Sequence, residues 1–534
     1  MKKLFLLLAL LGMVATGCST DEVDNGNDNK TEQPNENEGG SEDNIPENIF
    51  FDLDKESVTI SPDGGSVDVI VYSNYKWEIS GTSDWCTPSV KGGDANEDGQ
   101  KVTFSADVAD ADREATFWFC CADKQIKFVV SQKLNNVIYY TSSNGEIVQP
   151  NDSSAFGATI ISNTYKDGVG VIEFNDPITT IGENAFYGCT SLTSITIPDS
   201  VTTIGNSAFQ YCRSLTSVTI PDSITEIGYY AFCNCVSLTS VTIPDGVTTI
   251  GVAAFYYCRS LTSITIPDSV TTIGGAVFGF CNSLTSITIP DSVTTIGEAV
   301  FAWCSNLQEF KSKFATEDGR CLIIDGVLNS FAPAGLTEYT ILDSVTSIGY
   351  SAFEGCDSLT SVTIPNSVTT IGERAFWNCV SLTSVTIPDG VTTIGEDTFS
   401  ACISLKSVTI PNSVTTIGYN AFNECRSLTS VTIPDSVTTI GERAFSSCLS
   451  LKSVTIPDSV TTIGDYAFNQ CGSLTSVYCK ATIPPVALIN IGSWYAFYDN
   501  ASDLKIYVPM ESVEAYKSAR GWSEYANSIE GYNF

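Results

Sequence analysis

The sequence predicts a mainly β protein in which a small β-sandwich precedes a long solenoid of 23-residue repeats. Two observations lead to this fold class. Apolar and polar residues alternate in short runs between residues 49 and 133, as they do in half-buried strands. Beyond them one cysteine recurs in each repeat, at Cys189, Cys212, Cys235, Cys258, Cys281 and Cys304, then Cys356, Cys379, Cys402, Cys425, Cys448 and Cys471. So short a unit cannot bury its own apolar face, so the copies must stack into a long surface without a catalytic cavity.

The composition excludes several functions. The chain has 26 basic and 61 acidic residues, for a net charge of -35, whereas phosphate binding needs clustered Lys and Arg, so we expect no nucleic-acid partner. It has no histidine, which is the usual general base near neutral pH and a common metal ligand. No group of base, nucleophile or paired carboxylates stands out from the repeat. We therefore expect no enzyme activity, no catalytic residues, no metal and no cofactor.

Residues 1–17 have the layout of a signal peptide, with two lysines, an apolar run and then small residues. The segment ATGC, which ends at Cys18, resembles a bacterial lipobox, with alanine where leucine is usual. The resemblance implies cleavage before Cys18 and lipidation of its thiol, so that the protein meets the membrane through a lipid anchor only. The alternative is an ordinary secretory signal with an incidental cysteine, which would leave the protein soluble.

Residues 18–48 are rich in Asp, Glu, Asn and Gly and are too polar to form a core, so we expect an acidic flexible tether. The acidic run STDE directly after Cys18 resembles the surface-export signal of Gram-negative gut bacteria. The resemblance implies a lipoprotein of the outer membrane that is exposed at the cell surface.

Residues 49–133 are expected to form the β-sandwich. The run SNYKW ending at Trp77, then Trp85, the triplet REA beginning at Arg113 and the closing VSQ together resemble a BACON domain, a module of bacterial surface proteins. The resemblance implies an association with carbohydrates, although many such domains are spacers. Both tryptophans are better explained as core residues than as a platform for sugars.

The segment from Asp94 to Gly99 matches the first half of a calcium-loop pattern, whose alternating oxygen ligands converge on one cation. The bidentate glutamate that completes the pattern would fall at Ser105, inside an expected strand. A polar surface turn therefore explains this segment better than a metal site.

The repeats have distinct flanks. Residues 134–172 lack the repeat and are expected to cap the first coil. The repeats occupy residues 173–480, with an insert near 310–340 in which the run LIIDGVLNSF indicates a hairpin. Residues 481–534 lose the period, and an amphipathic run after a proline predicts a short helix in this C-terminal cap.

Each repeat can be divided into three parts. In the run VTTIG at 201–205 the glycine permits a turn closed to bulky residues. Phe209 and Cys212 are then three residues apart, as on one helical turn. In the run LTSVTIP at 215–221 alternate apolar residues face inward, and the proline ends the strand because it lacks an N–H. The string LxxVxIPxxVTxIGxxAFxxC closely resembles the BspA-like class of leucine-rich repeats, which implies a leucine-rich-repeat solenoid.

The cysteine column is expected to hold buried free thiols. Equivalent side chains in stacked coils lie about 4.7–4.9 Å apart, well beyond a disulfide bond of about 2.05 Å. Free cysteine is also among the most readily buried residues. Disulfide and metal interpretations are therefore disfavoured.

Two features are expected on the surface. Thr193, Ser194 and Thr196 with their successors predict columns of hydroxyl groups that can bind sugars or protein backbone. The position before the column cysteine is aromatic in the first block only, at Tyr211, Tyr257, Phe280 and Trp303. Three consecutive aromatics at one-coil spacing suit a strip for stacking on sugars or for anchoring a protein. The alternative is that the rings lie flat over neighbouring coils and seal the solenoid wall.

The sequence therefore predicts a surface recognition protein. BspA-like proteins are associated with adhesion, and the resemblance implies host matrix proteins or bacterial surface proteins as partners. A second interpretation is glycan capture for a polysaccharide-use system, with polysaccharide bound by the sandwich and the aromatic strip. A third is a passive spacer at the cell surface.

Overall fold

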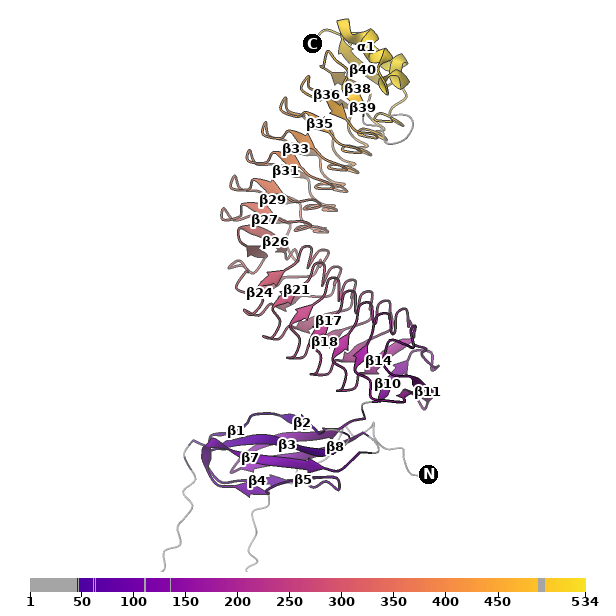
Figure 1. Cartoon of the computed structure of the whole chain (residues 1–534). Coiled ribbons are helices and arrows are strands. Elements are labelled where there is room, and N and C mark those ends of the chain that lie inside the picture. Colours follow the sequence, from indigo (N-terminus) through magenta and orange to yellow (C-terminus); the bar gives the residue numbers. More distant parts are fainter. Residues whose placement is uncertain are drawn as a thin grey trace, which may run out of the picture. The chain divides into compact units, whose positions relative to one another are not determined.

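The computed structural model describes residues 46, 48–60, 62, 64–109, 112–134, 136–487 and 495–534. The chain divides into two compact units, Met1–Asn135 and Asn136–Phe534. Both are built mainly from strands, and the second is a stack of short coils, which confirms the predicted solenoid (Figure 1). None of the described helices is long and apolar enough to cross a membrane.

The first unit contains two sheets that share one apolar core. In spatial order, one sheet consists of β1 (Phe51–Leu53), β3 (Gly65–Ser73), β7 (Asn96–Ala106) and β5 (Cys86–Pro88). The other consists of β2 (Ser57–Thr59), β9 (Lys124–Gln132), β8 (Arg113–Cys121), β4 (Trp77–Ser80) and β6 (Gly92–Gly93). Phe104, Phe117 and Phe128 are fully buried between the sheets, and the ring centroids of Phe104 and Phe117 lie 4.9 Å apart.

The two tryptophans of the BACON resemblance both contact this core. Trp77 is 4% exposed and belongs to the buried cluster. Trp85 is half-buried, and the guanidinium carbon of Arg113 lies 4.6 Å from the centroid of its ring. Both side chains therefore pack, as the sequence indicated, and neither forms an open platform for a sugar ring.

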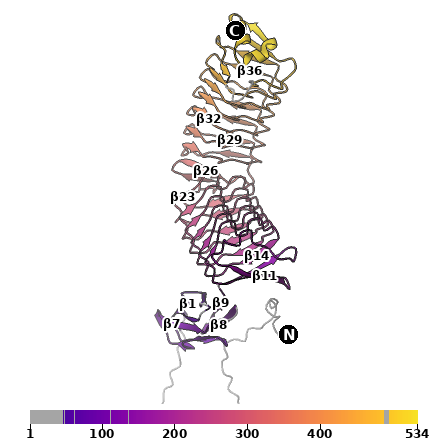
Figure 2. The same ribbon diagram turned by 45° about the vertical axis from the view of Figure 1, so that its right-hand side comes forward.

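Most coils of the second unit contribute two short strands, which pair in parallel with equivalent strands of neighbouring coils and form two rows along the stack (Figure 2). The first row, called the strand face below, contains β14 (Leu192–Thr196), β16 (Ser217–Thr219), β18 (Ser240–Thr242), β20 (Ser263–Thr265), β22 (Ser286–Thr288), β24 (Glu309–Lys311), β27 (Glu338–Thr340), β29 (Ser361–Thr363), β31 (Ser384–Thr386), β33 (Ser407–Thr409), β36 (Ser453–Ile456) and β38 (Ser476–Cys479). Residues that pair between adjacent coils are one repeat apart in the sequence, as are Val241 and Ile264. This register places equivalent side chains in columns.

The second row lies on another side of the same coils. It contains β13 (Thr180–Ile181), β15 (Thr203–Ile204), β17 (Glu226–Ile227), β19 (Thr249–Ile250), β21 (Thr272–Ile273), β23 (Thr295–Ile296), β28 (Ser347–Ile348), β30 (Thr370–Ile371), β32 (Thr393–Ile394), β34 (Thr416–Ile417), β35 (Thr439–Ile440), β37 (Thr462–Ile463) and β39 (Val486–Ala487). A glycine follows each of these strands except β39, and in most coils it is needed for space. A Cβ on Gly205 would lie 2.8 Å from the backbone nitrogen of Glu183 in the preceding coil. Close approach of coils, rather than a turn with positive φ, explains this glycine.

The third side of the coils consists of tight turns between each strand of the second row and the column cysteine, as at residues 206–212. We call this side the turn face. The spacing of Phe209 and Cys212 suggested a helical turn, but Ser207, Phe209 and Tyr211 instead donate their N–H groups to carbonyls of the next coil, at 2.8, 2.7 and 2.8 Å. An α-helix would direct these groups to carbonyls four residues back in its own chain. Ser207 and Tyr211 have left-handed φ angles of 54° and 64°. The turns therefore bond neighbouring coils together, which a helix would not do.

The core of the solenoid contains a column of stacked rings. The centroids of Phe209 and Phe232 lie 5.1 Å apart with the rings tilted by 4°, and those of Phe232 and Phe255 lie 5.4 Å apart with a tilt of 3°. The cysteines are buried and unpaired throughout the described chain, as expected. The thiol of Cys235 donates to the carbonyl of Phe209 at 3.2 Å, and the bond recurs in coils of both blocks. The thiols of the cysteine column thus donate hydrogen bonds to backbone carbonyls that are buried in the core.

Antiparallel strands cover the first coil. β10 (Val137–Ser142) pairs with β14 on one side and with β12 (Val169–Phe174) on the other, and β11 (Ile160–Lys166) forms the edge. At the other end of the unit the sheet continues through β40 (Lys505–Pro509) and β41 (Ile529–Tyr532). Between these strands lie η1 (Met510–Ser512), α1 (Val513–Ser518) and η2 (Trp522–Ser528). Trp522 of this segment is fully buried against the core.

The insert is a hairpin, as the sequence predicted. β25 (Cys321–Ile324) and β26 (Val327–Phe331) pair in antiparallel, joined by a two-residue turn in which both φ angles are positive. Leu322 packs in the core of the first block of coils. Phe331 packs in the core of the second block, with its ring centroid 4.7 Å from that of Phe353. The hairpin therefore joins the two runs of stacked phenylalanines.

Candidate functional site

Three of the four predicted aromatic residues form a stack on the turn face. The ring centroids of Tyr257 and Phe280 lie 4.3 Å apart, and those of Phe280 and Trp303 lie 4.9 Å apart with a tilt of 12°. All three rings are half-buried. The faces of Phe280 are therefore covered by its two neighbours, and the stack presents mainly the edges of its rings to the outside.

Tyr211 does not belong to this stack. Asn234 occupies the intervening coil in the same column, and Tyr211 instead contacts Tyr187, with centroids 5.5 Å apart and the rings nearly perpendicular. The guanidinium carbon of Arg213 lies 5.8 Å from the ring centroid of Tyr211. The aromatic column is thus divided into a pair and a separate stack of three.

The stack ends at the boundary between the two blocks. The indole Nε1 of Trp303 donates to a carboxylate oxygen of Glu354 at 2.6 Å. Burial raises the pKa of the Glu354 carboxyl, against the opposing effect of hydrogen bonds that include the one from Trp303. The backbone of Gly355 lies against the indole of Trp303. A Cβ at this glycine would be 2.5 Å from the Cδ2 atom of the indole, so a larger residue would clash. Trp303 therefore helps to seal the junction of the blocks as well as ending the stack.

The structure adds residues to this cluster that the periodic column did not identify. Tyr256 lies 5.4 Å from Phe280, and Trp377 lies 6.1 Å from Trp303, both nearly perpendicular to their partners. The guanidinium carbon of Arg259 lies 4.5 Å from the centroid of Tyr257. We call Tyr256, Tyr257, Arg259, Phe280, Trp303 and Trp377 the aromatic cluster. Trp377 is two residues before its column cysteine, whereas Trp303 is one residue before its own. The insert between the two blocks interrupts the period, so the sequence did not show that these two tryptophans lie close together.

The column position itself carries a backbone constraint that the sequence interpretation missed. Tyr257, Phe280 and Trp303 have φ angles of 64°, 61° and 63°. Glycine and asparagine accept such angles most readily, and both occur in this column, at Gly188, Asn234, Gly355 and Asn378. Ala401, Glu424, Ser447 and Gln470 have the same backbone conformation, so the left-handed angle belongs to the turn itself and costs about 1 kcal/mol at each residue with a side chain.

The strand face presents hydroxyl columns, but one of the three is already bonded. The hydroxyl of Thr216 donates to the carbonyl of Thr193 at 3.0 Å, and the same bond recurs from Thr239 and Thr262. The columns that continue Ser194 and Thr196 are exposed in most coils and have no such bond to the preceding coil among the described residues. These two columns are available to a partner.

An acidic column borders the strand face. The run IPD places one exposed aspartate after the strand in successive coils, at Asp222, Asp245, Asp268 and Asp291. This column continues in the second block, at Asp389, Asp435 and Asp458. The surface beside the strand face therefore has a negative potential that favours cationic groups on a partner.

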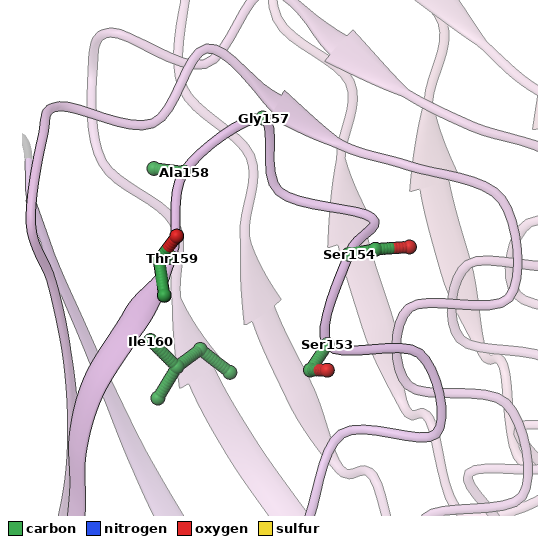
Figure 3. Close-up of a pocket in the computed structure, with 6 residues that line it drawn as sticks. All are labelled: Ser153, Ser154, Gly157, Ala158, Thr159 and Ile160. Atoms are coloured by element: carbon green, nitrogen blue, oxygen red, sulfur yellow. The ribbon is translucent and has the colours of Figure 1, made fainter.

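One hollow in the structure offers little chemistry, and one predicted site lies outside the described residues. A shallow hollow in the N-terminal cap is lined by Ser153, Ser154, Thr159 and Ile160 (Figure 3), without a charged side chain, and the hydroxyl of Ser154 is bonded to Asp152 at 2.7 Å. The expected lipidation site, Cys18, lies outside the described residues. The hollow offers no chemistry beyond a few hydroxyl groups.

Parallel strands, stacked rings and repeated surface columns define a leucine-rich-repeat solenoid whose surface is suited to binding. The chain belongs to the family described as BspA type leucine rich repeat region, whose model matches six copies within residues 179–308, 328–450 and 392–519. Proteins of this type are typically found at the cell surface, and leucine-rich-repeat proteins are as a rule binding proteins rather than enzymes. A search of curated proteins finds no match to the chain.

Solved structures of bacterial proteins resemble the chain. A leucine rich cell surface protein of Faecalibacterium prausnitzii is 34% identical over 55% of this chain and 86% of its own, with a TM-score of 0.45. A leucine-rich repeat protein of Bacteroides ovatus is 33% identical over 65% of this chain and 89% of its own, with a TM-score of 0.40. One of Eubacterium ventriosum is 26% identical over 58% of this chain and 89% of its own, with a TM-score of 0.44.

Proposed function

We propose that the chain is an adhesin-like recognition protein that binds host matrix proteins or bacterial surface proteins through its solenoid. The observation that carries this proposal is the aromatic cluster, in which side chains from several coils contact one another on the turn face. Tyr, Trp and Arg dominate the energetics of protein interfaces. The cluster brings all three residue types together on the turn face.

The geometry of the cluster favours a protein over a sugar. A sugar ring stacks on an open aromatic face, but the faces of Phe280 are covered by Tyr257 and Trp303, and Arg259 lies over Tyr257. The exposed ring edges and the tyrosine hydroxyl groups instead suit side chains and backbone of a protein partner. The acidic column beside the strand face adds attraction for basic partners and should make binding weaker at high salt.

We expect the double substitution Tyr257→Ser and Trp303→Ser to weaken retention of a matrix protein by about tenfold or more, because truncating central aromatic residues of an interface typically costs over 1 kcal/mol. Surface plasmon resonance on immobilised collagen, laminin and fibronectin measures this effect. Circular dichroism must show that the variant is folded, since Trp303 also packs at the junction of the blocks.

The matched control is the double substitution Tyr419→Ser and Tyr498→Ser, which removes two exposed tyrosines outside the cluster, 36% and 54% exposed. It is expected to bind as the parent protein does. Equal retention by a folded cluster variant and by its parent would show that the cluster only seals the solenoid wall.

The proposed location is the outer face of the outer membrane, with a lipid on Cys18 as anchor. The support is the lipobox-like segment and the acidic run after it. Cys18→Ser is expected to move the protein from the membrane fraction to the soluble fraction after cell breakage, and immunoblotting of both fractions measures this. A variant that stays in the membrane fraction would refute the lipid anchor.

A further inference from the structure

The segments that flank the insert hairpin and the neighbouring coils line an open polar hollow beside the strand face. Its volume is about 610 Å³, and its lining includes Ser283, Thr285, Asn306, Gln308, Arg320 and Gly335. Pockets that hold small ligands have volumes of roughly 300–1,000 Å³. We propose that this pocket, called the insert pocket below, binds a sugar that carries a carboxylate, such as a hexuronic acid unit.

One coil that lines the pocket has side chains at its outward-facing positions that differ from those of the repeat. The run Ser283-Leu284-Thr285 follows the repeat, whereas one coil later the corresponding positions hold Asn306 and Gln308 around Leu307. These two amides replace a serine and a threonine. An amide offers both a donor and an acceptor and reaches farther than a hydroxyl. The polar chemistry of the strand face therefore changes where the insert borders it.

Several of these polar groups remain available to a ligand. Among the described residues, neither the side-chain amide of Gln308 nor the hydroxyl of Thr285 has a hydrogen-bond partner, although Thr262 in the same column is bonded to the preceding coil. The Nδ2 atom of Asn306 donates to the carbonyl of Asn282 at 2.7 Å, which leaves its amide oxygen as an acceptor. The pocket therefore offers donors and acceptors that match the hydroxyl groups of a sugar.

Arg320 supplies the positive charge. Its Nη1 atom donates to the carbonyls of Ala332 and Ala334 at 3.2 and 2.9 Å, which anchors the guanidinium within the insert. The carboxylate of Asp318 accepts from the backbone N–H of Arg320, and no carboxylate of the described chain lies within ion-pair distance of the guanidinium. Against the opposing effect of burial, the guanidinium also contributes to the lowered pKa of the Asp318 carboxyl. Its remaining donors suit a carboxylate.

The charge of the chain limits the ligand to one with few negative charges. A polyphosphate or nucleic acid would be repelled by the net charge of -35, and the pocket lining holds a single cationic side chain. The pocket also has no aromatic side chain in its lining, so that recognition would rest on hydrogen bonds and one ion pair. A single uronic acid residue fits these requirements, either free or at the end of a polysaccharide.

Isothermal titration of the whole protein with galacturonate, glucuronate and glucose tests the proposal. We expect a uronate to bind at least about tenfold more tightly than glucose, because glucose lacks the carboxylate that pairs with Arg320. Gln308→Thr restores the residue that the repeat has at this position and should leave the fold intact, yet it should weaken uronate binding about fivefold. Arg320→Lys should weaken it at least about tenfold, because lysine cannot keep the anchored geometry.

The matched control is Lys406→Thr, which also restores the repeat residue in the column of Gln308 but in a distant coil. It should bind uronate as the parent does. Absence of uronate binding to the parent would overturn the proposal, as would equal loss in Lys406→Thr and Gln308→Thr, because binding would then not depend on the residues of the insert pocket. Tighter binding of an acetylated peptide with a free C-terminal carboxylate would assign the pocket to proteins instead. Comparison of galacturonate with oligogalacturonate distinguishes a free sugar from the end of a chain.

Discussion

Phe255→Ala is expected to lower the free energy of unfolding of the solenoid by about 3–5 kcal/mol, as for other large-to-small changes of buried aromatics. Phe255 is fully buried, and its ring centroid lies 5.4 Å from that of Phe232 and 5.9 Å from that of Phe278. Truncation therefore leaves a cavity and removes contacts with both adjacent coils. Because each coil is stabilised mainly by its neighbours, the loss affects both interfaces of one repeat.

Urea unfolding followed by circular dichroism measures this change. The exposed Thr242, which lies on β18, provides the control, since Thr242→Ala should change stability by less than about 0.5 kcal/mol. A loss below about 1 kcal/mol in Phe255→Ala would contradict a continuous ring column.

Alkaline pH is expected to destabilise the solenoid strongly. Burial raises the pKa of the Cys304 thiol from its usual value of 9.0 to about 12, and burial raises the pKa of Cys258 and Cys281 in the same way. Since the pKa of these thiols is higher in the folded protein than in the unfolded chain, their contribution to the free energy of unfolding is fully present below about pH 9. It is lost as the pH rises toward 12, because only the unfolded thiols ionise in this range.

Each thiol that ionises only on unfolding removes about 1.4 kcal/mol of stability per pH unit above its unfolded pKa. Several such thiols together should lower the stability by several kcal/mol near pH 10. Urea midpoints at pH 8, 9 and 10 under reducing conditions provide the measurement. The double variant Cys258→Ala and Cys281→Ala should show a shallower decline, whereas a slope equal to that of the parent would mean that these thiols are accessible when folded.

The period of the sequence was sufficient to predict most of the solenoid. The strands, the inward positions of Leu215 and its equivalents and the Asp325-Gly326 hairpin all follow from local patterns, because each rests on side-chain alternation or turn chemistry. The turn segments were predicted less well. Phe209 and Cys212 have helical spacing, but the N–H groups there bond to the next coil, and spacing within one repeat contains no information about bonds between repeats.

The candidate sites were predicted only in part. Tyr257, Phe280 and Trp303 share a column, so their stack could be anticipated from their numbering. Arg320 and Gln308 could not be placed together, because the insert interrupts the period and its fold decides which side chains meet. The left-handed backbone of the column was also hidden, since aromatic residues rarely adopt it.

The most direct test of the central claim is binding by the two units separately, residues 46–135 and 136–534, to arrays of host matrix proteins, bacterial surface proteins and polysaccharides. The proposed function predicts that the solenoid unit retains protein ligands as the whole chain does, while the sandwich unit retains none. Polysaccharide binding by the sandwich unit, with no protein retained by the solenoid unit, would contradict it and would identify the chain as a glycan-capture protein.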